Sequence, residues 1–200
     1  MSRLDTACLY LHGFNSSPAS QKATQLMQWY AERDAAQYLA VPELSPFPAV
    51  AMAQARQLVE DMSARFGIDN LLVVGSSLGG YYARFLAEQY AVRAVMINPA
   101  IRPYELLAAY LGENRNLYTG ATYQLGPEHM QQLLDMRIQT LSRPQNCLLL
   151  LQTGDETLDY RQASAEYLTS PMLVSAGGNH SYEDFTQRIP LILEFAKHKS

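Results

Sequence analysis

Six short apolar runs are the feature that most constrains the fold of this 200-residue chain. They lie at residues 7–11, 38–41, 71–74, 92–97, 147–152 and 172–176. Most are separated by segments with helical spacing of apolar side chains, such as residues 20–33 and 49–66. Short apolar runs that alternate with helices are typical of a parallel sheet buried on both faces. We therefore predict a three-layer α/β fold with about six parallel strands between layers of helices.

Composition places the chain among globular proteins and makes several partners unlikely. Hydrophobic residues make up 48% and charged residues 17%, which fits one α/β domain over residues 1–200. The net charge of -4 and the absence of a basic patch argue against nucleic-acid binding. The apolar runs are far shorter than the ~20 residues of a membrane helix, and the N-terminal sequence is unlike a signal peptide. We expect a cytoplasmic protein without membrane insertion.

Two parts of the chain depart from the regular alternation. Residues 101–143 are rich in tyrosine and partly helical, and we expect them to form a short cap-like excursion over one edge of the sheet. Only six residues precede the first run, so the sheet is expected to lack the antiparallel strands that often begin larger folds of this kind.

The cysteines do not indicate a disulfide or a metal site. Cys8 and Cys147 lie in the first and fifth runs, which we place three strands apart. That separation is roughly 14 Å, too far for a disulfide bond. No Cys/His spacing suggests zinc, and the chemistry predicted below needs no metal or organic cofactor.

The motif with chemical content is Gly75-Ser76-Ser77-Leu78-Gly79, which has the pattern G-x-S-x-G. An apolar run precedes it and a helical pattern follows it, which is the context of a nucleophile elbow. Such a turn holds its central serine in a strained conformation with the hydroxyl exposed, at the N-terminus of the following helix. The spacing of the glycines therefore predicts Ser77 as the nucleophile.

The base for Ser77 is sought among the four histidines of the chain. In folds with this elbow an acid and then a histidine follow the serine, each after a later strand. His180 follows the sixth run directly, in the sequence GGNHS. His12 precedes the nucleophile, and we expect His129 on the surface of the excursion and His198 at a frayed terminus. We therefore predict His180 as the general base.

The acid that orients His180 is expected directly after the fifth run. Asp155 is the first carboxylate there, before the chain turns away, and Glu156 and Asp159 follow closely. Asp159 is better suited to cap the helix that begins near residue 160. We predict Asp155 as the acid, with Asp159 and Glu156 as the alternatives.

Two backbone N–H groups are expected to form an oxyanion hole. One belongs to Leu78, the residue after the nucleophile. The other belongs to Phe14, in the loop after the first run, where Gly13 permits the backbone to twist. We expect His12 to fix this loop by hydrogen bonding and to border the substrate site; the alternative role is that of a second general base.

Further substrate-binding candidates come from the excursion. Arg102 is positioned to bind an anionic group of the substrate, although a salt bridge to Glu105 is the more common role for such a residue. Tyr104 is expected at an apolar pocket together with other residues of the excursion: Leu106, Leu107, Tyr110, Tyr118 and Tyr123. Simple packing of these side chains onto the sheet is the more common role for such residues.

Several segments resemble the α/β-hydrolase superfamily, and most closely the small bacterial YqiA/YcfP-like esterases. They are spread from residue 9 to residue 185: LYLHGFNSSP, VGSSLGGYYA, NPAIRPYELL, YLGENRNLYTG, LLQTGDETLDYRQA and GGNHSYEDF. The resemblance implies an α/β-hydrolase fold, with Ser77, Asp155 and His180 as a catalytic triad. It also implies esterase activity on small acyl esters, with acyl-CoA thioesters as a related substrate class. The alternatives are a non-catalytic binding protein with this fold, and perhydrolysis or C–C hydrolysis by the same triad.

Overall fold

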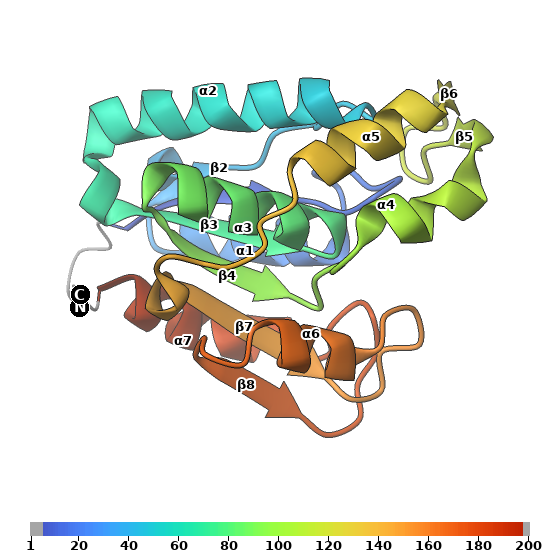
Figure 1. The fold of residues 1–200 in the computed structure, drawn as a ribbon. Coiled ribbons are helices and arrows are strands. Elements are labelled where there is room, and N and C mark those ends of the chain that lie inside the picture. Colours follow the sequence, from blue (N-terminus) through green and yellow to red (C-terminus); the bar gives the residue numbers. More distant parts are fainter. Residues whose placement is uncertain (1–5, 198–200) are drawn as a thin grey trace.

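A six-stranded parallel sheet forms the centre of the computed structural model, which describes residues 6–197 (Figure 1). The strand order is β2-β1-β3-β4-β7-β8, and every pair of neighbours is parallel. The strands are β1 (Ala7–Leu11), β2 (Leu39–Ala40), β3 (Leu71–Ser76), β4 (Arg93–Ile97), β7 (Cys147–Gln152) and β8 (Met172–Ser175). The predicted parallel sheet is confirmed. His198 lies outside the described residues.

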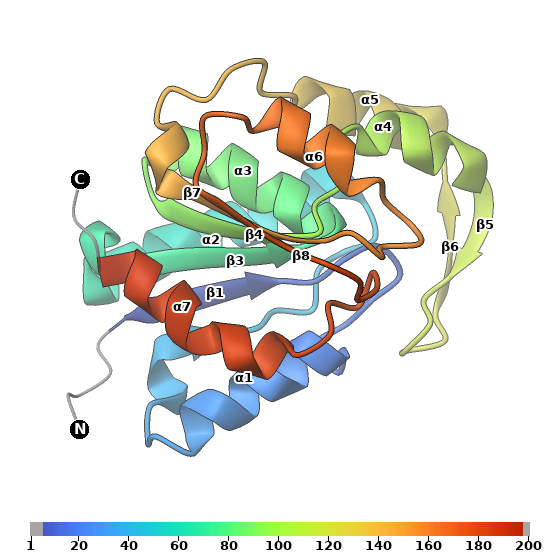
Figure 2. The ribbon, with the colours of Figure 1, turned by 90° about the horizontal axis from the view of Figure 1, so that it is seen from below.

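Helices cover both faces of the sheet and complete the three predicted layers. Figure 2 shows α1 and α7 on one face and α2, α3 and α6 on the other. Their bounds are α1 (Gln21–Ala31), α2 (Pro48–Phe66), α3 (Leu78–Tyr90), α6 (Tyr160–Glu166) and α7 (Phe185–Lys197). Short 3-10 helices lie at Ala36–Tyr38, Ile68–Asn70, Leu107–Tyr110 and Pro144–Asn146.

Alternate residues of each strand enter two separate hydrophobic cores. In β1, Leu9 and Leu11 pack with α2 and α3, whereas Cys8 and Tyr10 pack with α1 and α7. This two-sided burial explains why the inner strands are continuous apolar runs. The edge strands β2 and β8 have one neighbour each, and their side chains are only partly buried.

Residues 101–143 contain an element that the sequence analysis did not predict. Besides α4 (Pro103–Leu106) and α5 (Pro127–Asp135), the segment forms an antiparallel hairpin of β5 (Gly112–Arg115) and β6 (Thr122–Leu125). Each hairpin strand buries a single side chain, Asn114 or Leu125, and therefore gives no apolar run.

The segment 101–143 was expected over one edge of the sheet, but much of it packs on a helical layer instead. Leu107, Leu125 and Leu133 pack into the core between the sheet and α2 and α3, and α5 lies against α2 (Figure 1). The hairpin stands beyond the carboxyl ends of the strands (Figure 2). The segment is thus anchored to one helical layer and leaves the strand ends accessible from the side of α1.

The two cysteines lie where the strand order predicts. Cys8 is in β1 and Cys147 in β7, with β3 and β4 between them, and both are buried free thiols. Burial raises the pKa of each thiol to about 12, so both stay protonated and unreactive at neutral pH.

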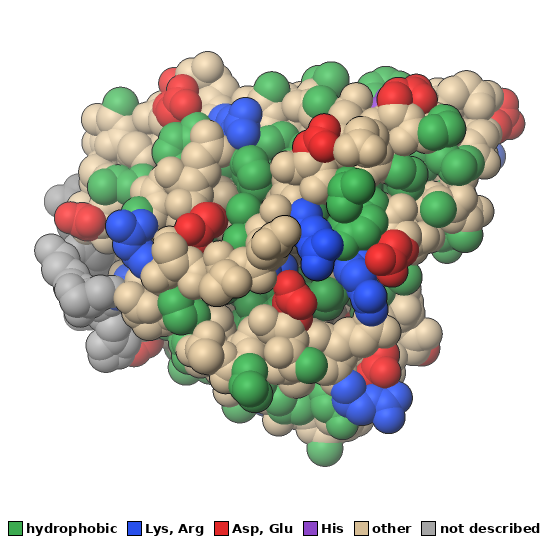
Figure 3. All heavy atoms as spheres, viewed as in Figure 1, with side chains coloured by type: hydrophobic (Ala, Val, Ile, Leu, Met, Phe, Trp, Pro, Cys, Tyr) green, Lys and Arg blue, Asp and Glu red, His purple; other side chains and the backbone are tan. Residues whose placement is uncertain are grey.

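The described residues carry further features that bear on partners. None of their helices is long and apolar enough to span a lipid bilayer. Acidic and basic side chains are interspersed on the face shown in Figure 3. Within residues 6–197, no three His, Cys, Asp or Glu side chains gather closely enough to hold a metal ion.

The strand order reverses between β1 and β3. The chain runs from β1 outward to β2 and then returns to β3 on the other side of β1. In open parallel sheets, ligands bind outside the carboxyl ends of the strands at such a switch point. The loop after β1 and the turn after β3 therefore define where a functional site is expected.

Candidate active site

Ser77 occupies the sharp turn between β3 and α3. Its backbone angles are φ 56° and ψ -119°, a conformation that costs free energy for any residue with a side chain. Hydrogen bonds hold it there: the Ser77 N–H donates to Ile97 O at 3.0 Å, and Ser77 O accepts from the N–H groups of Gly80 and Ala100 at 3.0 and 3.1 Å. This is the strained strand-to-helix elbow that the G-x-S-x-G motif predicts.

The glycines of the motif are required because backbones meet at this turn. A Cβ on Gly75 would overlap the backbone of Gly79, and a Cβ on Gly79 would overlap the backbone of Leu11. A side chain on Gly75 would push the start of α3 away from β3, and one on Gly79 would push it away from β1. The two glycines therefore set the position of Ser77 relative to the loop after β1.

The loop after β1 packs directly on Ser77. A Cβ on Gly13 would lie 3.2 Å from the Cβ and 3.6 Å from the Oγ of Ser77. Neither the N–H of Phe14 nor that of Leu78 makes a hydrogen bond to another described residue. Two free backbone donors thus flank the serine, as an oxyanion hole needs.

His180 lies in the loop after β8 and is hydrogen-bonded to Asp155, in the loop after β7. The distances from His180 Nδ1 to the two carboxylate oxygens of Asp155 are 3.0 and 2.8 Å. The Asp155 side chain is 1% exposed and also accepts hydrogen bonds from the N–H groups of Thr157 and Leu158. A carboxylate only accepts, so Nδ1 of His180 carries the proton and Nε2 is available as an acceptor.

The alternative acids make other contacts. Glu156 accepts a hydrogen bond from the backbone N–H of His180 at 2.9 Å and does not touch the ring. Asp159 caps α6 by accepting from the N–H of Arg161 and also binds the Arg161 side chain, which lowers the pKa of Asp159. Of the three candidates, Asp155 is therefore the one placed to orient the imidazole.

A pocket of about 280 Å³ brings three of the candidate residues together, whereas Asp155 and Leu78 are not part of its lining. Ser77, His180 and Phe14 line it. The other lining residues come from β1 and the loop after it, the start of α1, the end of β3, the hairpin turn and the loop after β8: Tyr10, Gly13, Asn15, Ser16, Ser20, Gln21, Lys22, Ser76, Leu117, Tyr118 and Ser181. Among the described residues no hydrogen bond joins Ser77 Oγ to His180. Such contacts often tighten only when substrate is bound.

Two buried amide side chains that the sequence analysis missed hold the His180 loop, which we define as residues 176–184. Asn98 Nδ2 donates to the carbonyl of Asn179 at 3.1 Å. Gln152 Oε1 accepts from the N–H groups of Asn179 and Glu183, and its Nε2 donates to Glu183 O. Asn98 follows an apolar run and Gln152 ends one. A polar residue at the carboxyl end of a predicted strand was the sequence feature that could have identified them.

Lys22 is the third residue that sequence reasoning missed. It lies in the first turn of α1, is 9% exposed, and its Nζ donates to the carbonyl of Ser181 at 2.8 Å. The signal was its register, since Lys22 shares the buried face of α1 with Leu26 and Tyr30 at spacings of four residues.

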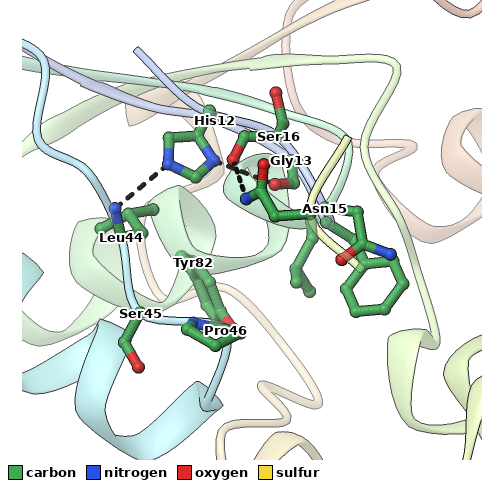
Figure 4. A pocket seen from close by; sticks show the side chains of 11 residues that line it. His12, Gly13, Asn15, Ser16, Leu44, Ser45, Pro46 and Tyr82 are labelled. Carbon is green, nitrogen blue, oxygen red and sulfur yellow. Dashed lines mark hydrogen bonds between the residues drawn. The ribbon is translucent and has the colours of Figure 1, made fainter. Parts of the chain in front are cut away.

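His12 is held between two loops and lines a small cavity with Phe14 and Leu78 (Figure 4). It does not line the pocket that Ser77 and His180 share, so its predicted substrate contact is not found there. The ring is 4% exposed; Nδ1 donates to Gly13 O at 3.0 Å, and Nε2 accepts from the N–H of Leu44 at 3.1 Å. Both nitrogens are occupied, which agrees with the loop-fixing role and leaves none for general base catalysis.

The buried His12 should make stability depend on pH. Burial lowers its pKa from 6.5, so below about pH 6.5 the unfolded state binds a proton that the folded state resists. The free energy of unfolding should therefore fall as pH drops, by at most about 1.4 kcal/mol per pH unit from this group. Urea unfolding between pH 5 and 8 should show a shallower fall for His12→Gln. Identical slopes in both proteins would contradict this role.

Arg102 and Tyr104 do not line the pocket, so their predicted substrate contacts are not found. Arg102 is exposed and pairs with Glu105 at 3.5 Å, the alternative considered above. Tyr104 packs partly buried against the core below α4. The excursion packs against α2 and α3, and neither residue is part of the pocket lining.

The part of residues 101–143 that does line the pocket is the hairpin turn. Leu117 and Tyr118 line the pocket, and both are mostly exposed. Asn116 Nδ2 donates to Ser16 O at 2.9 Å, and Tyr123 Oη donates to Asn15 Oδ1 at 2.6 Å. These bonds join the hairpin to the loop after β1.

His129 was expected on the surface but is mostly buried. Its Nδ1 accepts from the N–H of Gly126 at the start of α5, and its ring stacks on Phe47 at a centroid distance of 4.9 Å. It lies away from the pocket and closes the first turn of α5.

Solved structures share this arrangement of strands and helices. Est1E from Butyrivibrio proteoclasticus, with ferulic acid bound, matches 96% of this chain and 86% of its own at 14% identity, with a TM-score of 0.68. The esterase domain of a Rhodothermus marinus protein matches 98% and 88% at 16% identity, with a TM-score of 0.70. Mouse alpha/beta hydrolase domain-containing protein 10 matches 94% and 87% at 15% identity, with a TM-score of 0.63. At these identities the likeness concerns the fold alone.

The family resemblance read from the sequence is confirmed. The model of the Uncharacterised protein family (UPF0227) matches residues 7–197, a range that includes the elbow, the loop after β1 and the His180 loop. The chain belongs to this family, and its fold is that of the α/β-hydrolases.

Proposed function

We propose that the protein is a serine esterase that hydrolyses carboxylic esters of small molecules through an acyl-enzyme. One observation carries the proposal: Ser77, strained at the elbow, shares a pocket with His180, whose Nδ1 is hydrogen-bonded to the buried Asp155. Nucleophile, base and orienting acid in this arrangement are what acyl transfer through serine requires.

In the first half-reaction, Nε2 of His180 takes the proton of Ser77 as Oγ attacks the ester carbonyl. The N–H groups of Phe14 and Leu78 stabilise the negative charge on the carbonyl oxygen, helped by the N-terminus of α3. Asp155 holds the ring with Nδ1 protonated and stabilises the imidazolium. His180 then gives its proton to the leaving alcohol, and the acyl group remains on Ser77.

In the second half-reaction, His180 removes a proton from water as the water attacks the acyl-enzyme. The same N–H pair stabilises the second oxyanion, and the proton returns to Ser77 as the acid leaves. Every step uses groups of this chain and water.

The structural neighbours support this reaction class. One is an esterase domain, and Est1E was solved with ferulic acid, a carboxylic acid, bound. The modest volume of the pocket, about 280 Å³, favours short acyl groups. The substrate is expected to be a soluble ester, with acyl thioesters as the second class to test.

A panel of p-nitrophenyl esters tests the proposal. We expect turnover of acetate and butyrate esters, with kcat/KM decreasing for longer chains, and an acyl-CoA in the same panel measures thioester hydrolysis. The release of p-nitrophenol and of free thiol are the readouts. Absence of hydrolysis of every ester and thioester would overturn the proposal.

A further inference from the structure

A buried cation lies in the candidate active site. The Lys22 side chain is nine-tenths buried, and the bond to Ser181 O is the only hydrogen bond of its ammonium group to the described residues. An ammonium group has three donors, so two remain without an acceptor among residues 6–197. Lysine is rarely buried without a partner that offsets its lost hydration.

The environment of Lys22 destabilises the charged ammonium form but leaves it the major form at neutral pH. Burial lowers the pKa of Lys22 to about 8, and the Asp155 carboxylate opposes this change. At neutral pH most of the molecules therefore carry an ammonium ion here. An anion placed against it would recover part of the lost solvation as a charge-assisted hydrogen bond.

Lys22 is the only lysine or arginine in the pocket lining, and the nearby Asp155 carboxylate lies outside that lining. None of its lining residues, all of which are described, is Asp or Glu. The first residues of α1, Gln21 and Lys22, also line it, and their backbone N–H groups make no hydrogen bond to described residues. Free N–H groups at the start of this 11-residue helix add to the attraction for an anion.

From this placement we propose that Lys22 binds an anionic substituent, a carboxylate or phosphate, on the ester that Ser77 attacks. The inference rests on the proposed function and narrows it, since the preferred substrates are then anionic esters. The anion can belong to the acid part or to the alcohol part of the ester, and both parts can be tested.

A purely structural role for Lys22 makes a different prediction. The bond to Ser181 O joins α1 to the His180 loop, so loss of Lys22 can also disturb the base. That disturbance would slow neutral and anionic substrates alike, because it acts on His180. The ratio of kcat/KM between matched anionic and neutral esters separates the two roles.

Two matched pairs of substrates provide the test. Mono-p-nitrophenyl glutarate against p-nitrophenyl valerate places the charge in the acid part. The ester 4-butyryloxybenzoate against 4-butyryloxybenzamide places it in the alcohol part. We expect the wild-type protein to prefer the anionic member of at least one pair by about 10–100-fold, as a hydrogen bond to a charged group provides.

Three variants complete the experiment. Lys22→Met, which keeps the length of the side chain without its charge, should bring the ratio to about 1, and Lys22→Arg should retain most of it. Lys197→Met is the control, because Lys197 is an exposed lysine at the end of α7 paired with Glu194. It should leave the ratio unchanged.

The outcomes distinguish the inference from the function on which it rests. A wild-type ratio near 1 in both pairs, or an unchanged ratio in Lys22→Met, would overturn the role of Lys22 while turnover of the neutral esters still supports the esterase. Absence of turnover with every substrate would overturn the esterase itself.

The pH dependence of the ratio gives a second readout. The charged or titratable groups around Lys22 are Asp155 and His180 in the loops, Tyr10 in β1 and Tyr118 in the hairpin turn. Titration of these groups changes kcat/KM for both esters of a pair equally, so its effect on catalysis cancels in the ratio. The anionic preference should therefore weaken as pH rises through about 8, where Lys22 loses its proton. A preference that stays constant to pH 10 would contradict the proposal.

Discussion

Replacing Ser77 with alanine should lower kcat for ester hydrolysis by about 10⁶-fold, to the residual rate that binding and the oxyanion donors provide. The reason is that no other hydroxyl occupies the elbow with this backbone geometry, so the acyl-enzyme cannot form. Initial rates with p-nitrophenyl butyrate measure the effect, and circular dichroism checks that the variant is folded.

Ser76→Ala is the matched control for the register of the elbow. Ser76 ends β3 and is the other serine of the motif, but its backbone belongs to the strand. We expect this variant to retain most of its activity. If Ser77→Ala kept comparable activity, or if Ser76→Ala lost it instead, the assignment of the nucleophile would be wrong.

Asp155→Asn should lower kcat by about 10⁴-fold, the second largest effect expected here. The amide can donate to Nδ1 of His180, which would place the proton on Nε2 and leave it unable to accept from Ser77. The variant also loses the charge that stabilises the imidazolium. Steady-state kinetics measure the loss, and the KM should change much less than kcat.

The two rival carboxylates supply the controls for Asp155. Glu156→Gln keeps an oxygen that can accept from the His180 N–H, so we expect a far smaller loss of activity. Asp159→Asn retains an N-cap side chain and should leave both activity and stability close to those of the wild type. A loss of 10³-fold or more in either control, with Asp155→Asn nearly active, would reassign the acid.

The core of the fold could be predicted from the sequence because local patterns of apolar residues indicate its strands and helices. Inner strands buried on both faces appear as apolar runs, and the helices between them show apolar spacing. The hairpin β5–β6 escaped prediction because its strands are polar and four residues long. Its position depends on bonds such as Asn116 to Ser16 and Tyr123 to Asn15, about a hundred residues apart in the chain.

Some residues of the candidate site could likewise be predicted from local patterns, and others could not. Ser77, Asp155 and His180 could be found because each follows a strand, and parallel strands bring such positions to one edge. Arg102 and Tyr104 were misplaced because the path of the excursion depends on its packing against α2 and α3. Lys22 was missed because a lysine in an amphipathic helix is usually at the surface, and its burial depends on the distant His180 loop.

The most direct test of the central claim is covalent labelling by a fluorophosphonate probe, followed by mass spectrometry of the peptides. Such probes react with a serine activated by a neighbouring base and an oxyanion hole. We predict stoichiometric labelling of the wild-type protein at Ser77, and none in Ser77→Ala. Absence of labelling in the wild type, or labelling at another residue, would contradict the account.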